Sequence, residues 1–155
     1  MVNKMKYKRI ILLILIILWC GLIFNLSSQK AVNSTELSGG VINKVLNLFG
    51  HDITEYESSV VLCMQIVIRK SAHMFLYCIL AILIKLELME YNIKNSNVMA
   101  ILLTILYAIT DEIHQNFVMG RSCEVRDIIV DLVGALIGIG LICLYKYSKN
   151  KCRGD

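Results

Sequence analysis

Residues 10–26, IILLILIILWCGLIFNL, contain no charged side chain. A helix of roughly 20 predominantly apolar residues is needed to cross a bilayer, and this stretch lies within the usual range. Basic residues precede it, as in a signal peptide, but no small-x-small cleavage site follows. We therefore interpret residues 10–26 as an uncleaved first membrane span.

Three further apolar stretches lie at residues 60–84, 98–109 and 126–145, and the second of these continues into polar residues up to Gln115. The chain has 155 residues, of which 57% are hydrophobic and only 18% are charged. Soluble domains carry about 25% charged residues. The sequence predicts an all-α bundle of four transmembrane helices in a single domain over residues 1–155, with a core at about 10–145.

The connection between the first two spans has its own pattern. Residues 27–36 are polar, whereas apolar residues recur near helical spacing within 37–49. The pattern predicts a short amphipathic helix over 37–49, which lies on the membrane surface, caps the bundle or is solvated within the loop. Residues 51–58, 85–97 and 116–125 are expected to be loops.

Basic residues gather at both ends of the chain: Lys4, Lys6, Lys8 and Arg9 before the first span, and Lys146, Lys149, Lys151 and Arg153 after the last. The positive-inside rule then predicts a multi-pass protein of the cell membrane with both termini in the cytoplasm. The net charge of +4 is too small to indicate nucleic acid as a partner.

Charged residues of the last three spans gather at the outer end of each. The stretches 73–84, 98–109 and 132–145, which carry no formal charge apart from His73 itself, cover only roughly 18–21 Å of helix, whereas a hydrocarbon core is about 30 Å thick. The residues that begin where these stretches end are Arg69, Lys70, His73, Asp111, Glu112, His114, Gln115, Arg126, Asp127 and Asp131, with Arg121 in the loop above. Ionisable groups at this depth must pair or line a watery cavity.

The charged outer end of the predicted bundle, its mouth, has two interpretations. It is a salt-bridge network that holds the helices, in which the cations and the acids neutralise one another, or it is a site where arginines bind a lipid phosphate, a diphosphate carrier or a carboxylate. The candidate ligand-binding residues are Arg69, Lys70, His73, Tyr77, Asp111, Glu112, Gln115, Arg121, Asp127 and Asp131. Below them, the Gly134-x-x-x-Gly138 spacing predicts close contact with a neighbouring helix.

Catalysis is a further hypothesis for the same mouth. The candidate acid/base or metal-ligating residues are His73, Asp111, Glu112 and His114. No HExxH spacing is present, and none of the six cysteines forms a CxxC pair, so we expect no metal and no cofactor. The spacing leaves open a disulfide between Cys63 and Cys123.

Four motifs occur in order along the chain: Phe24-x-x-Ser27-Ser28-Gln29, Arg69-Lys70-x-x-His73-x-x-x-Tyr77, Asp111-Glu112-x-x-Gln115-x-Phe117-x-x-Gly120-Arg121 and Asp127-x-x-x-Asp131-x-x-Gly134. Together they resemble the VanZ-like family of bacterial membrane proteins over about residues 10–140. The family usually has proline before the Gly-Arg pair, where this chain has Met119.

The founding member of the VanZ-like family gives low-level resistance to the glycopeptide antibiotic teicoplanin. The resemblance therefore implies a non-enzymatic cell-envelope factor that engages an anionic lipid-linked cell-wall precursor, a peptide or a glycopeptide at the outer leaflet. One alternative is an intramembrane hydrolase or transferase acting on a lipid phosphate or a lipid-linked precursor. Another is a scaffold that docks a second membrane protein through residues 37–49. The sequence does not determine the oligomeric state.

Overall fold

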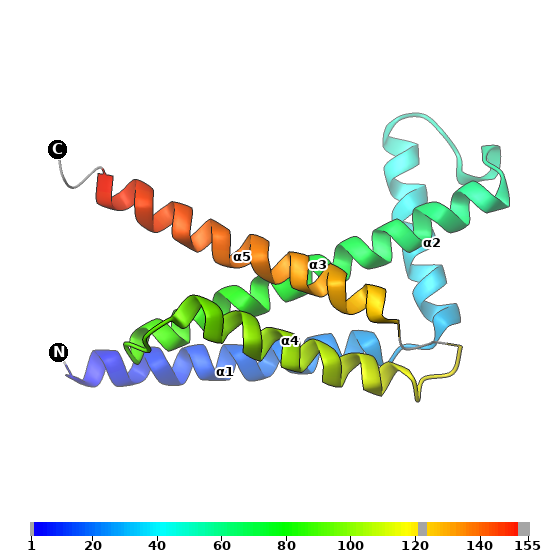
Figure 1. The fold of residues 1–155 in the computed structure, drawn as a ribbon. Coiled ribbons are helices and arrows are strands. Elements are labelled where there is room, and N and C mark those ends of the chain that lie inside the picture. The colour runs from blue at the N-terminus through cyan, green and yellow to red at the C-terminus, as the bar shows by residue number, and fades with distance from the viewer. Residues whose placement is uncertain (1, 121–123, 152–155) are drawn as a thin grey trace.

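A computed structural model describes residues 2–120 and 124–151 of the chain (Figure 1). These residues form five α-helices and one short 3-10 helix, and no strand. The elements are α1 (Val2–Ser27), α2 (Ala31–Leu48), η1 (Ile53–Glu55), α3 (Ser58–Glu90), α4 (Ser96–Gln115) and α5 (Val125–Lys151). The predicted all-α class is confirmed.

Four of these helices, α1, α3, α4 and α5, are long and apolar enough to cross a membrane, as the sequence predicted. Their outer faces carry many exposed apolar side chains, such as Ile17 and Leu18 of α1, which suit a lipid environment. The beginning of α1 and the end of α5 lie at one end of the bundle (Figure 1). The α1–α2 and α4–α5 connections lie at the other end, which we call the mouth.

Helix α3 is the longest element. Its 33 residues extend over about 50 Å, whereas the 20 residues of α4 cover about 30 Å, close to the hydrocarbon thickness. The first turns of α3 therefore project past the mouth, and α2 crosses them there (Figure 1). The helix predicted in this connection is therefore present, and it packs across α3.

The predicted start of α2 was wrong. The helix begins at Ala31, within the polar stretch 27–36 that preceded the predicted start at residue 37. Polar residues are accommodated there because Ser34 and Ser38 are buried and the Ser38 hydroxyl donates to the Ser34 carbonyl oxygen at 2.9 Å. After α2, the exposed Asp52 accepts hydrogen bonds from the Thr54 backbone N–H and hydroxyl, which lowers the pKa of the Asp52 carboxyl.

The predicted inner loop, residues 85–97, was too long. Helix α3 continues to Glu90, and the Lys85 and Glu87 side chains are buried inside the bundle. The Lys85 ammonium donates to the Cys143 sulfur at 3.1 Å, so its charge lies against α5 and not in water. Asn92 and Asn95 adopt positive φ angles of 53° and 61° in the tight turn that remains.

Close contact between α3 and α5 holds the centre of the bundle. A Cβ atom added at Gly134 would lie 2.2 Å from the Met74 carbonyl oxygen, and one added at Gly138 would lie 2.4 Å from the Cys78 carbonyl oxygen. Only glycine permits this approach of the two backbones. The prediction that the glycine stripe packs against another helix is confirmed.

Two aromatic side chains tie α1 to its neighbours through backbone carbonyl oxygens. The Trp19 indole N–H donates to Leu76 of α3 at 2.9 Å, and the Tyr107 hydroxyl of α4 donates to Cys20 at 2.7 Å. Between the helices lies a core of fully buried apolar residues that includes Ile23, Leu80 and Ala135. These bonds and this core fix the helix ends that form the mouth.

Candidate functional site

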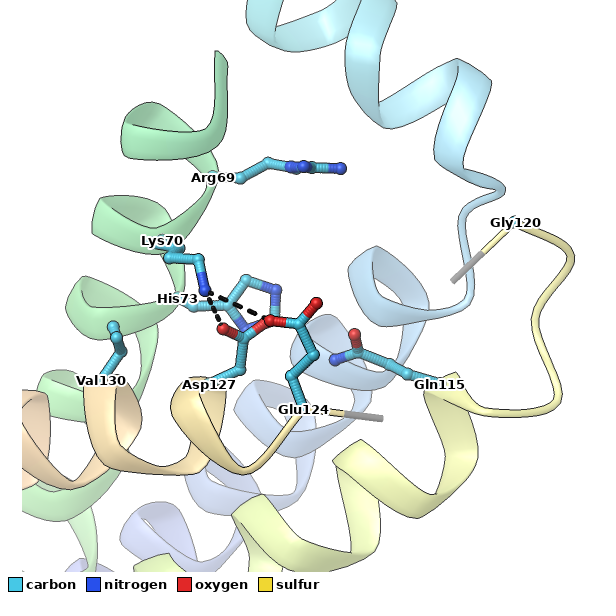
Figure 2. Close-up of a pocket in the computed structure, with 8 residues that line it drawn as sticks. All are labelled: Arg69, Lys70, His73, Gln115, Gly120, Glu124, Asp127 and Val130. Carbon is cyan, nitrogen blue, oxygen red and sulfur yellow. Dashed lines mark hydrogen bonds and ion pairs between the residues drawn. The ribbon is translucent and has the colours of Figure 1, made fainter. Parts of the chain in front are cut away.

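A polar cavity of about 230 Å³ opens at the mouth (Figure 2). Helix α3, the end of α4, the α4–α5 connection and the start of α5 form its walls. Its lining residues are Arg69, Lys70, His73, Gln115, Gly120, Glu124, Asp127 and Val130. Five of the predicted ligand-binding residues are therefore brought to one cavity from three helices.

Lys70 is paired with acids on the α5 side of the cavity. Its ammonium forms an ion pair with Asp127, and the Glu124 Oε2 atom lies 3.9 Å from the same nitrogen (Figure 2). All three side chains are partly exposed at the cavity wall. The positive charge of Lys70 is thus already compensated by protein groups.

Arg69 is the neighbouring residue on α3 but has a different environment. Its guanidinium extends from α3 into the opening (Figure 2). It makes no ion pair or hydrogen bond with any residue of the segments 2–120 and 124–151. The Arg69 side chain is half-buried as a whole, and its guanidinium keeps its donors available.

Below the cavity lies a layer of buried carboxyl groups. Asp111 is 3% exposed, and its Oδ2 atom accepts hydrogen bonds from the Ser27 hydroxyl at 2.7 Å and from the Gln115 amide at 3.1 Å. This arrangement links the end of α1 to α4. Ser27, which belongs to the first of the four motifs, is fully buried and positions a predicted site residue.

Glu112 and Asp131 complete this buried layer. Glu112 accepts a hydrogen bond from the Glu124 backbone N–H at 3.1 Å, so it anchors the chain where α5 begins. Asp131 is 2% exposed, and its Oδ1 atom lies 3.9 Å from the His73 Nδ1 atom. Tyr77 is fully buried one turn below His73, with the two ring centroids 6.4 Å apart. Glu112, Asp131 and Tyr77 therefore support the cavity floor and do not line it.

His114 faces away from the cavity and toward α1. Its ring stacks on Phe24 with centroids 4.3 Å apart, and its Nε2 atom lies 3.1 Å from the Ser28 hydroxyl oxygen. Of the candidate catalytic residues His73, Asp111, Glu112 and His114, His73 lines the cavity and the other three do not. Within residues 2–120 and 124–151, no group of three His, Cys, Asp or Glu side chains is placed to hold a metal ion.

The expected mutual neutralisation of cations and acids is only partly seen. Lys70 is the one lysine or arginine of the mouth that pairs with an acid among the described residues. Arg126 is exposed and takes no part in the cavity. The physical reason is that adjacent residues on a helix point about 100° apart, so Arg126 points away from the cavity that Asp127 lines. Arg121 and Cys123 lie outside the described residues, and Cys63 is a free thiol.

Three lining residues, Gly120, Glu124 and Val130, were not predicted from the sequence. Glu124 had a recognisable signal, because it lies three residues before Asp127 at the start of a span. Its carbonyl oxygen accepts a hydrogen bond from the Asp127 N–H at 2.9 Å, which is the first turn of α5. Acids at such helix starts are favourably placed.

The VanZ/LLP1 family model matches residues 12–146, which include every residue that lines the cavity. No curated protein and no solved structure is significantly similar to the chain. The match covers nearly the whole chain, and it agrees with the four motifs that meet at the mouth. This chain therefore belongs to the VanZ/LLP1 family.

Proposed function

We propose that this protein is a non-enzymatic cell-envelope factor that binds the anionic group of a lipid-linked cell-wall precursor, or of a related peptide ligand, at the outer leaflet. The observation that supports the proposal best is Arg69, a half-buried residue at a polar cavity whose guanidinium has no protein partner among the described residues. An uncompensated charge at this depth is costly, so an anionic ligand would relieve it.

The distribution of charge within the cavity favours the same ligand. Lys70 engages Asp127 and Glu124 on the α5 side, which leaves Arg69 as the charged side chain on the opposite side. A guanidinium offers a planar fork of donors that matches phosphate and carboxylate oxygens. A phosphate or carboxylate next to Arg69 would lie away from Glu124 and Asp127.

The change Arg69→Gln tests this proposal directly. Charge-assisted hydrogen bonds contribute about 1.5–3 kcal/mol, so we expect affinity for a lipid monophosphate to fall by roughly 10- to 100-fold. The measurement is a titration of the purified full chain in nanodiscs of phosphatidylcholine. Arg126→Gln is the matched control, because Arg126 is exposed and does not line the cavity. Equal affinities of the two variants would contradict the proposal.

The proposal places the mouth on the extracytoplasmic side. The start of α1 and the end of α5 carry basic residues, and both lie at the end of the bundle opposite the mouth (Figure 1). A reporter fused after Asn92 should therefore read cytoplasmic, and one fused after Met119 should read external. The reverse pattern would move the cavity to the inner leaflet and end the outer-leaflet proposal.

We also propose a link to glycopeptide action, which rests on the resemblance to the VanZ-like family. Expression in a sensitive Gram-positive host should raise the teicoplanin inhibitory concentration. The Arg69→Gln variant, present in the membrane at the same level, should leave that concentration at the value of the empty host. No rise with the unaltered protein would remove the resistance role, whereas a rise that survives Arg69→Gln would separate resistance from the cavity.

A further inference from the structure

An apolar groove of about 410 Å³ lies where α2 crosses the projecting part of α3. Val45 and Leu46 of α2 form one wall, and Val60, Met64 and Val67 of α3 form the other. No charged side chain lines the groove. Such a surface is suited to hydrocarbon and not to a polar ligand.

The groove continues toward the polar cavity. A second cavity of about 150 Å³ lies between α2 and α3 and shares Ile68 with the groove. The second cavity also shares Arg69 and His73 with the polar cavity. Three adjoining hollows therefore follow α3 inward, and their lining changes from wholly apolar at residue 60 to charged at residues 69–73.

We propose that one membrane amphiphile occupies these hollows together, with its phosphate at Arg69 and a hydrocarbon chain in the groove between α2 and α3. This inference rests on the proposed function and narrows its ligand to a lipid phosphate. A free anion would leave the groove unused, whereas a neutral lipid would leave Arg69 unpaired.

The position of Arg69 supports a single occupant. Ile68, which lines the groove, and Arg69, which lines the polar cavity, are consecutive residues of one helix, so the two environments meet within a few ångströms. A phosphate bonded to Arg69 therefore carries the start of its chain directly to the apolar walls. Helix α2 forms the other wall of the groove. This role explains why α2 packs across α3 and does not cross the membrane.

Photocrosslinking of the full chain in phosphatidylcholine nanodiscs tests the inference. The probe is phosphatidic acid with a diazirine in its acyl chain, and phosphatidylcholine with the same chain is the reference. We expect adducts of phosphatidic acid to concentrate on residues 42–46 and 60–68 at least threefold more than adducts of the reference lipid. This enrichment should disappear in Arg69→Gln and persist in Arg126→Gln.

Blocking the groove provides the second readout. Cys63 lines the groove, whereas the adjacent Leu62 does not and is exposed, so Cys63→Trp and Leu62→Trp form a matched pair at almost equal depth. Cys63→Trp should weaken binding of long-chain phosphatidic acid several-fold and leave a water-soluble short-chain lipid phosphate unaffected. Leu62→Trp should change neither.

The outcomes separate the two proposals. Binding that depends on Arg69 but gives adducts spread alike for both lipids would overturn the groove and keep the anion site. Equal effects of Cys63→Trp and Leu62→Trp would also overturn the groove. Binding of neither lipid phosphate to the unaltered protein would overturn the anion site and the groove with it.

Discussion

Changing Gly134 to valine should lower the free energy of unfolding of the bundle by about 3 kcal/mol or more. The α3 backbone leaves no room for a side chain there, since even a Cβ atom would lie 2.2 Å from the Met74 carbonyl oxygen. The obstacle is backbone and not the end of a flexible side chain, so relief requires α3 and α5 to separate. That separation would also move Asp127 away from Lys70.

The measurement is equilibrium unfolding in mixed detergent micelles, followed by the fluorescence of Trp19, the sole tryptophan of the chain. Gly140→Val provides the control on the same helix, because nothing lies within 4 Å of a Cβ atom added at Gly140. We expect this control to change stability by less than about 1 kcal/mol. Equal losses for the two variants would show that the close contact of α3 with α5 does not stabilise the bundle.

Changing Asp111 to leucine should lower the free energy of unfolding by about 2–6 kcal/mol. The substitution preserves approximate size but removes the acceptor of the Ser27 hydroxyl and of the Gln115 amide, both of which are buried. Each buried donor left without an acceptor costs about 1–3 kcal/mol. The loss should be accompanied by weaker attachment of α1 to α4 at the mouth.

Asp111→Asn is the informative control, because an asparagine oxygen still accepts a hydrogen bond from Ser27. This variant should recover most of the stability lost in Asp111→Leu, measured by the same unfolding titration. If asparagine were as damaging as leucine, the negative charge of Asp111 would matter more than its bonding. If leucine were harmless, the bond from Ser27 would contribute nothing.

The membrane spans could be predicted because apolar length is a property of the sequence alone. The failures occurred where a polar residue is buried by partners distant in sequence. Ser34 belonged to the polar stretch 27–36 that preceded the predicted helix, yet it is buried within α2. Lys85 appeared to mark the end of a span, yet its ammonium is inside the bundle and donates to the Cys143 sulfur of α5. Composition gives no signal for such long-range compensation.

The members of the candidate site were mostly predictable, but their pairing was not. The sequence placed Arg69 and Lys70 at the same depth, and the structure confirms that both line one cavity. Only the rotation of α3 decides that Lys70 meets Asp127 while Arg69 extends into the opening. That rotation follows from the glycine contact with α5, because Gly134 seats against Met74 one turn from Lys70.

The same glycine contact has a consequence for biogenesis. Helix α5 is synthesised after α3 and α4, and it supplies both the glycines that pack against α3 and the Asp127 that pairs with Lys70. Until α5 enters the bilayer, Lys70 lacks this partner and the cavity lacks one wall. The nascent protein must therefore tolerate the Lys70 ammonium without Asp127 from the synthesis of α3 to that of α5, and the mouth is completed only when α5 is in place.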